Sequence, residues 1–110
     1  MIPARYQPQH DIGLAQRLIE EEKYVASRPN ALKKLDDLNM TQTQMEEILL
    51  GLTKDDYCKS EIDRNNEDWQ DYFKPKRKIG GYRLFIKWKI IKNNSLLIVT
   101  SFKEDTDNLS

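Results

Sequence analysis

The chain has 110 residues, of which 38% are hydrophobic and 33% are charged, and its formal net charge is zero. This length suits a single domain over residues 1–110 with a small core, and it leaves little room for a second domain. No stretch approaches the roughly 20 apolar residues that span a bilayer, the N-terminus lacks a secretory signal, and the one cysteine, Cys58, excludes an intrachain disulfide, so we expect a cytoplasmic protein with no membrane partner.

The N-terminal half is predicted to be helical. Residues 11–23 form the first helix, with Asp11 as N-cap and apolar residues near one face. The stretch KYVAS is compatible with a short edge strand, and Arg28-Pro29-Asn30 breaks the chain after it. Asn30 can then cap a second helix through ALKKLDDL, whose alanine and leucines make an apolar stripe.

Two capping-box patterns indicate further helices. In TQTQMEEILLGL, Thr43 is followed three residues later by Glu46, and the apolar residues keep the spacing of a buried helix face. In TKDDYCKSEI, Thr53 and Asp56 repeat the pattern, which predicts a short helix. The helical part is therefore expected to run from about residue 11 to about residue 60.

The chain from about residue 68 to about residue 103 has the character of strands separated by turns. The first strand lies in WQDYFKPK, where Pro75 indicates an edge or a bulge. Gly80-Gly81 and KNNS are the turns before and after YRLFIKWKII, and LLIVTSF is predicted to be a central strand. Helices followed by strands predict an α+β fold, with N-terminal helices packed on one face of a C-terminal antiparallel sheet.

The basic residues gather in this strand region. From Tyr72 to Lys103 there are nine Lys or Arg and no Asp or Glu. In YRLFIKWKII the cations share one parity with Phe85 and the large apolar residues share the other, so one sheet face is basic and the other is apolar. A basic face can hold phosphates even when the net charge is zero. The alternative is that the cations protect edge strands against aggregation.

Common catalytic and metal-binding motifs are absent from the sequence. It contains no GxxxxGK[ST] loop, no paired cysteines with metal-ligand spacing and no HExxH motif, so we expect no metal and no cofactor. Cys58 is expected to be a small buried residue, because no histidine partner is evident for an activated thiol. His10 is expected to be a satisfied or solvated side chain, and Trp69 and Trp88 are expected in the core.

Four blocks between residues 51 and 104 resemble the successive motifs of one toxin family. The blocks are GLTKDDYCKS, WQDYFKPK, GYRLFIKW and LLIVTSFKE. They are similar, in the same order, to the patterns G-L-s-x-x-D-F-Y-K-S, W-Q-D-V-Y-x-P, G-x-x-x-Y-x-K and L-x-V-x-S-F-K. These patterns are those of the MqsR family, the motility quorum-sensing regulator-type toxins.

The resemblance implies a RelE-like fold and a toxin of a type II toxin–antitoxin system that acts in the stress response. The implied activity is that of an mRNA interferase, a hydrolase that binds mRNA and cleaves it. It would be a metal-independent and ribosome-independent endoribonuclease with short GC-containing sites. The resemblance also implies a zinc-bearing antitoxin of the MqsA type, through which the toxin would reach DNA only indirectly.

The resemblance also carries functional residues to this chain. The expected catalytic residues are Lys59 of the first block, Gln70 of the second and Lys103 of the fourth, and Lys87 matches the lysine of the third. Phe85 stands where the third pattern has a tyrosine, so the hydroxyl group expected there is missing.

Cleavage of RNA without a metal needs a base for the 2′-hydroxyl group, donors for the phosphorane oxygens and an acid for the leaving 5′-oxygen. We expect Lys59 and Lys103 to flank the scissile phosphate and Gln70 to orient it. A lysine can also serve as base or acid where burial and nearby cations lower its pKa. The further residues expected to grip phosphates or stack on bases are Arg83, Lys87, Tyr82, Tyr72, Phe85, Lys76 and Arg77.

Other interpretations stay open at this point. The KPKRK run is alternatively a solvated face or a docking site for an acidic antitoxin, and Asp71 is expected to anchor a nearby cation. Because Phe85 has no hydroxyl group, the chain is alternatively a non-catalytic module that binds RNA or an antitoxin. A third alternative is a small interaction protein whose acidic helices and basic sheet self-associate.

Overall fold

A mixed sheet of six strands forms the centre of the structure, a computed structural model that describes residues 4–62 and 68–106. In chain order the elements are β1 (Ala4–Arg5), α1 (Ile12–Glu20), β2 (Tyr24–Ala26), the π-helical turn η1 (Arg28–Leu32), α2 (Lys34–Leu38), α3 (Gln42–Leu50), the 3-10 helix η2 (Lys54–Asp56), β3 (Tyr57–Ile62), β4 (Trp69–Phe73), β5 (Leu84–Ile91) and β6 (Leu96–Glu104). The strand order across the sheet is β1-β3-β4-β5-β6-β2. The prediction of an α+β fold is confirmed.

Neighbouring C-terminal strands pair antiparallel, as predicted. Between β5 and β6, Lys92, Asn93 and Asn94 have φ angles of 54°, 56° and 65°, a conformation that asparagine tolerates well. The sheet as a whole is mixed rather than antiparallel, because β2 runs parallel to β6. This correction arises because N-terminal segments join the sheet: β1 pairs with β3, and β2 covers the outer edge of β6.

The C-terminal strands begin at Tyr57 rather than at about residue 68. The capping box of Thr53 and Asp56 forms as predicted, but it closes only the single turn η2. Tyr57 is already extended, with φ −68° and ψ 139°, and the residues after it pair with β4. The prediction of helix up to about residue 60 is wrong because pairing with the next strand, β4, outweighs the local helix signal.

Two helical segments begin earlier than predicted. Ser27 rather than Asn30 caps the segment η1, since the Ser27 Oγ accepts a hydrogen bond from the backbone N–H of Asn30 at 3.3 Å. Thr41 rather than Thr43 caps α3. The Thr41 Oγ1 accepts from the backbone N–H of Gln44 at 3.1 Å, and the Gln44 Oε1 accepts from the backbone N–H of Thr41 at 2.8 Å. The capping box is therefore present, two residues before the predicted one.

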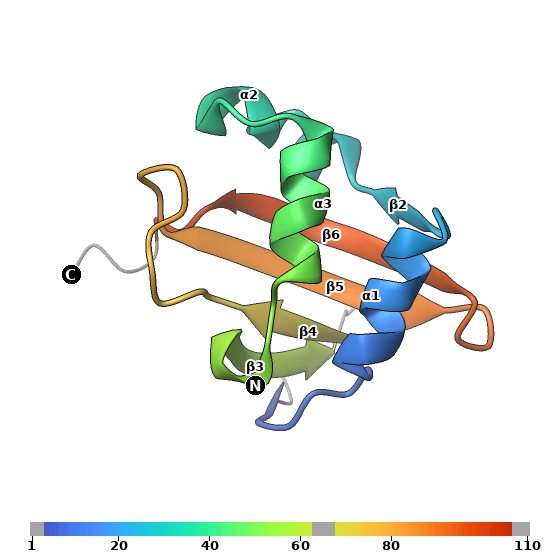
Figure 1. Cartoon of the computed structure of the whole chain (residues 1–110). Coiled ribbons are helices and arrows are strands. Elements are labelled where there is room, and N and C mark those ends of the chain that lie inside the picture. The colour runs from blue at the N-terminus through green and yellow to red at the C-terminus, as the bar shows by residue number, and fades with distance from the viewer. Residues whose placement is uncertain (1–3, 63–67, 107–110) are drawn as a thin grey trace.

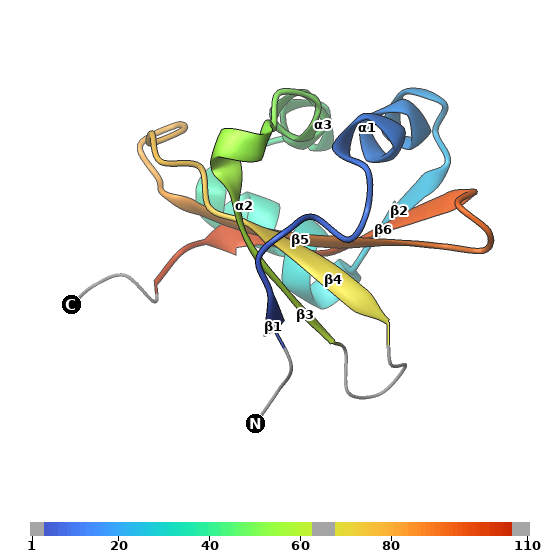
Figure 2. The same cartoon turned by 90° about the horizontal axis from the view of Figure 1, so that it is seen from below.

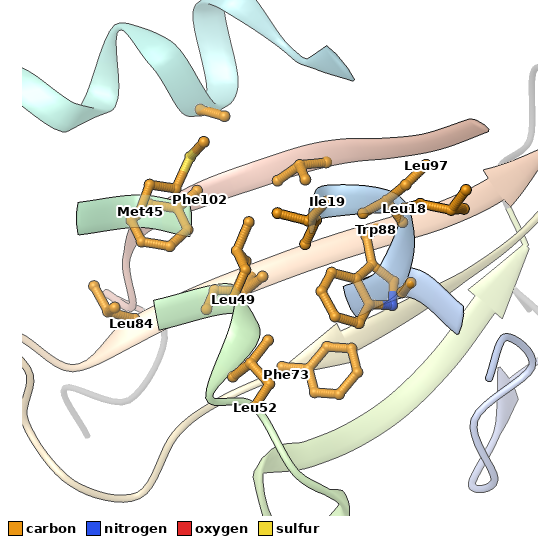
Figure 3. Close-up of a cluster of buried hydrophobic side chains, with 14 of the residues drawn as sticks. Leu18, Ile19, Met45, Leu49, Leu52, Phe73, Leu84, Trp88, Leu97 and Phe102 are labelled. Carbon is orange, nitrogen blue, oxygen red and sulfur yellow. The ribbon is translucent and has the colours of Figure 1, made fainter. Parts of the chain in front are cut away.

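Helices α1 and α3 lie side by side on one face of the sheet, whereas η1 and α2 pack beside β6 at its edge (Figure 1 and Figure 2). None of the described helices is long and apolar enough to cross a membrane. The core lies between the two helices and the sheet, as Figure 3 shows for Leu18, Ile19, Met45, Leu49, Leu52, Phe73, Leu84, Trp88, Leu97 and Phe102. The predicted apolar parity of β5 is confirmed by the burial of Leu84, Ile86, Trp88 and Ile90.

Candidate functional site

The face of the sheet opposite α1 and α3 carries most of the predicted site residues. Directly paired residues of antiparallel strands project to the same face. Lys59 of β3 pairs with Tyr72 of β4, and Tyr72 pairs with Lys87 of β5. Lys87 in turn pairs with Ser101 of β6, so that four strands contribute to one continuous row. Because the core residue Phe73 follows Tyr72 in β4, this row faces away from the core.

The ring of Tyr72 lies between two lysine ammonium groups. The Nζ of Lys59 is 5.5 Å from the centroid of this ring, and the Nζ of Lys87 is 5.2 Å from it. Cations within about 6 Å of a ring centroid are attracted by its π-electrons. The two strands that flank β4 therefore each supply one positive charge to the same aromatic ring.

The ring of Phe85 has the same kind of surroundings. The Nζ atoms of Lys74 and Lys103 lie 5.8 Å and 5.6 Å from its centroid. The rings of Tyr72 and Phe85 meet edge to face, with centroids 5.4 Å apart. We call this set the cation–aromatic cluster; its members are Lys59, Lys74, Lys87, Lys103, Tyr72 and Phe85. The prediction that one sheet face is basic with aromatic residues in it is confirmed.

Lys59 forms an ion pair with Glu61, a residue that the sequence analysis did not single out. The distance from the Lys59 Nζ to the Glu61 Oε2 is 2.8 Å. The hydrogen bond to Glu61 raises the pKa of Lys59 from its ordinary value, and the hydrogen bond from Lys59 lowers the pKa of Glu61. Lys59 is therefore held as an ammonium, and the alternative in which a lowered pKa makes it a neutral base does not apply to the free protein. The pairing of Lys59 with Glu61 could have been predicted from a strand, because residues two apart in a strand share a face, but this segment was predicted to be helical.

Gln70 lies in β4 beside the cluster and is 6% exposed. Its side-chain carbonyl accepts a hydrogen bond from the Thr100 hydroxyl group at 2.5 Å. Thr100 stands where the pairing of β5 with β6 shifts register, between the pairs Lys87–Ser101 and Trp88–Val99. Because the carbonyl oxygen is engaged, the orientation of the Gln70 amide is set.

A hollow of about 250 Å³ opens beside Phe85. It is lined by Phe85, Lys87, Ser101, Lys103, Glu104, Asp105 and Thr106. Asp105 is 8% exposed, and its Oδ2 lies 3.6 Å from the Nζ of Lys74, so that it forms an ion pair with this lysine of the cluster. The hollow has one aromatic ring, two ammonium groups and two carboxylates in its lining.

The other predicted substrate-binding residues are spread more widely. Tyr82 packs against the core on the helix side of the sheet, so the structure does not bring it to the cluster. Lys76, Arg77 and Arg83 are exposed in the connection between β4 and β5. The Nη1 of Arg83 donates a hydrogen bond to the backbone carbonyl of Lys76 at 2.7 Å, which braces this connection.

Asp71 is fully buried, and its role differs from the prediction that it anchors a cation. Its carboxylate accepts hydrogen bonds from the backbone N–H groups of Gln9 and His10, both at 2.9 Å, and from the Ser60 hydroxyl group at 2.5 Å. Backbone donors thus take the place of the expected cation, and Asp71 fastens the N-terminal segment to the helix side of β4.

The remaining reactive side chains lie apart from the cluster. The Nε2 of His10 is 2.7 Å from the backbone carbonyl of Trp69, so this histidine is satisfied, as predicted. Cys58 is exposed rather than buried. Trp88 is fully buried as predicted, whereas Trp69 is half-buried beneath the guanidinium group of Arg5. Within residues 4–62 and 68–106, no three His, Cys, Asp or Glu side chains are grouped so that they could hold a metal ion.

The fold and the cluster define a small α+β protein with a cationic, aromatic sheet face. Residues 7–104 match the family model described as motility quorum-sensing regulator, toxin of MqsA. The chain therefore belongs to this family, which confirms the resemblance seen in the four sequence blocks. It is a toxin of a toxin–antitoxin system and has an antitoxin as its partner. No curated protein matches the chain.

Proposed function

We propose that the chain is a metal-independent, ribosome-independent endoribonuclease with a RelE-like fold, an mRNA interferase that cuts at short GC-containing sites in the cytoplasm. The observation that supports this proposal best is the cation–aromatic cluster, in which each of two rings lies between two ammonium groups. A surface of this kind suits single-stranded RNA, since bases stack on rings while lysines hold the backbone.

RNA would lie across the strands over the two rings. Lys59 and Lys103 belong to β3 and β6, which are separated by β4 and β5. With strands ~4.8 Å apart and Lys103 two residues along β6 from the row of Lys59, the two Cα atoms are about 16 Å apart, and the rings of Tyr72 and Phe85 lie between them. Stacking of a base on either ring contributes about 1–3 kcal/mol. The expected arrangement of the two lysines on either side of the scissile phosphate is compatible with this geometry.

The chemistry that the residues support is transesterification by the 2′-hydroxyl group. The 2′-oxygen attacks phosphorus, the bond to the 5′-oxygen breaks, and the products are a 2′,3′-cyclic phosphate and a 5′-hydroxyl group. Lys59 and Lys103 stabilise charge on the phosphorane oxygens as compact ammonium donors. Gln70 orients the phosphate through its NH₂ group.

The antitoxin partner is proposed to be a zinc-bearing protein of the MqsA type. The exposed cations of the connection between β4 and β5, Lys76, Arg77 and Lys78, suit contact with an acidic surface or with RNA. DNA would be reached only through this partner.

Primer extension on a defined mRNA tests the activity. The mRNA is incubated with the purified protein in EDTA, beside the variants Lys59→Ala and Lys103→Ala. The matched control is Lys23→Ala, since Lys23 is an exposed lysine that pairs with Glu21 beyond the end of α1. Discrete cuts that survive EDTA and the control, and that disappear in the cluster variants, are the expected result. Full cleavage by both cluster variants would remove the catalytic assignment.

A second candidate function follows from Phe85, which has no hydroxyl group to move a proton. If the missing hydroxyl group abolishes cleavage, the chain is a non-catalytic module that binds RNA or its antitoxin. A gel-shift assay separates the two functions, because a binding module retards RNA and leaves it intact.

A further inference from the structure

We propose that Tyr72 and Glu61 form the proton-transfer pair of this site, with Tyr72 as a catalytic residue and Glu61 as the base behind it. This inference rests on the proposed endoribonuclease function and names the group that would accept the proton of the attacking 2′-hydroxyl. It starts from the position of the Tyr72 ring, which is central to the cluster and in contact with Phe85.

The sheet register places the two side chains together. Glu61 pairs with Gln70, and Tyr72 lies two residues beyond Gln70 on the same face. Such diagonal neighbours are within reach of an aromatic side chain. The Glu61 carboxylate holds the ammonium group of Lys59 at 2.8 Å, and Tyr72 contributes, after Lys59, to the lowered pKa of this carboxyl group. A hydroxyl donor and a carboxylate acceptor thus lie beside the ammonium groups that would hold the phosphate.

The charge state of Glu61 suits the role of acceptor. Hydrogen bonds from Lys59 and Tyr72, together with the charge of Lys87, lower its pKa, so the carboxyl is ionised near neutral pH. A low pKa also makes a carboxylate a weak base. Bound RNA changes this, because a phosphate competes for the Lys59 ammonium group. When Lys59 turns to the phosphate, the largest cause of the lowered pKa of Glu61 is withdrawn, and the carboxylate becomes more basic as the substrate arrives.

The proton step balances. The phenol oxygen of Tyr72 accepts the proton of the 2′-hydroxyl group while the phenol proton passes to Glu61, and the 2′-oxygen forms its bond to phosphorus. The electron pair of the breaking bond goes to the 5′-oxygen, which takes a proton from an adjacent lysine ammonium group. Afterwards Glu61 gives its proton to solvent, and the lysine regains one. Phe85 cannot take part in this transfer, but its ring supports the ring of Tyr72 at 5.4 Å.

Removing one oxygen atom tests the inference. Tyr72→Phe keeps the ring, and with it the contacts to Lys59, Lys87 and Phe85, but it removes the hydroxyl group. We expect the single-turnover cleavage rate on the mRNA described above to fall by about 100-fold or more, since general acid–base groups contribute 10²–10⁴-fold. Binding of a single-stranded DNA oligonucleotide, which lacks the 2′-hydroxyl group and stays intact, is expected to be unchanged. Glu61→Gln is expected to lower the rate in the same way.

A second substitution distinguishes chemistry from support of the fold. In the Tyr72→Phe background, Phe85→Tyr places a hydroxyl group on the neighbouring ring, and we expect part of the lost rate to return. If the native chain cleaves RNA and Tyr72→Phe cleaves it equally fast, the proposed function stands and this inference is overturned. If the native chain leaves RNA intact, the proposed function itself fails, and the inference falls with it.

Discussion

The salt dependence of binding to single strands follows directly from the number of lysines in the cluster. Each phosphate neutralised by a cation contributes about 0.7 to the slope of log K against log salt concentration for single strands. Four contacts, from Lys59, Lys74, Lys87 and Lys103, would give a slope of about −2.8 (0.7 × 4). Affinity would then fall about 50-fold between about 50 mM and about 200 mM salt.

Lys59 and Lys74 already hold carboxylates in the free protein. Lys59 pairs with Glu61 at 2.8 Å, and Lys74 pairs with Asp105 at 3.6 Å. A paired lysine has fewer counterions to release, so the contribution of these two is reduced. If they contributed nothing, the slope would be about −1.4 and the loss of affinity about sevenfold. These ion pairs therefore make the expected slope shallower than about −2.8.

Fluorescence anisotropy with a labelled single-stranded DNA oligonucleotide measures this slope without cleavage. Lys87→Ala is expected to make the slope shallower by up to about 0.7, because one phosphate contact is lost. Lys23→Ala, which removes a lysine outside the cluster, is the matched control and is expected to change nothing. A slope that is unaffected by Lys87→Ala, or equally affected by Lys23→Ala, would refute the assignment of the open sheet face as the binding surface.

Three further predictions concern the folded state and are measured by urea unfolding or thermal melting. Asp71→Ala leaves two backbone donors and a buried hydroxyl group without their acceptor, and it is expected to lower the free energy of unfolding by about 3–5 kcal/mol. The control Asp11→Ala, at an N-cap position without a side-chain hydrogen bond, is expected to lower it by less than about 0.5 kcal/mol. Thr41→Ala is expected to cost about 1 kcal/mol through loss of the cap of α3, and Thr43→Ala is expected to be neutral; equal costs would contradict the observed cap. The pKa of Glu61 is lowered in the folded state. The ionised Glu61 carboxylate therefore stabilises the fold fully above the ordinary pKa of 4.5, and this stabilisation is lost as the pH falls through the pKa of the folded state. As the pH falls over that range, the melting temperature of Glu61→Gln is expected to decrease less than that of the native chain.

Strand periodicity could be read from the sequence because it depends on one strand at a time. The alternation in YRLFIKWKII predicted which side of β5 would be apolar, and burial of Leu84, Ile86 and Trp88 follows it. The same parity rule predicted that Phe85 and Lys87 share the opposite face with other cations. It could not predict that Lys89 is buried, since this depends on its ion pair with Asp68 at 3.2 Å, from a different part of the chain.

Helix starts were misplaced because adjacent residues offer equivalent local signals. In TQTQMEE, both Thr41 and Thr43 are followed three residues later by a side chain that can complete a capping box. Which one is used depends on the helix phase that buries Met45 and Leu49 against the sheet, which is a tertiary effect. Asn30 was misplaced for a similar reason, since Ser27 stands three residues earlier and provides the cap.

The error at β3 concealed Glu61, the ion-pair partner of Lys59. In a helix, Lys59 and Glu61 would point in different directions, but in a strand they share a face and form an ion pair. That strand forms because the next strand, β4, pairs with it, and this pairing outweighs the helix signal of the capping box. The sequence could therefore name Lys59, Gln70 and Lys103 singly, but not the carboxylate that raises the pKa of Lys59.

At Phe85, comparison of the sequence with the family patterns and the arrangement of the strands lead to different conclusions about which chemical groups the site contains. Compared block by block, the chain lacks the tyrosine hydroxyl group of the third family pattern, which favours a non-catalytic protein. In the sheet, however, β4 and β5 are neighbours, and the ring in contact with Phe85 belongs to Tyr72, where the second family pattern has a valine. A hydroxyl group therefore lies one strand away, beside Lys59 and Lys87 rather than Lys74 and Lys103, and the Glu61 carboxylate lies beyond it, on β3. Loss at one position and gain at its neighbour in space are consistent with a site that keeps the same chemical groups while changing the strand that supplies one of them.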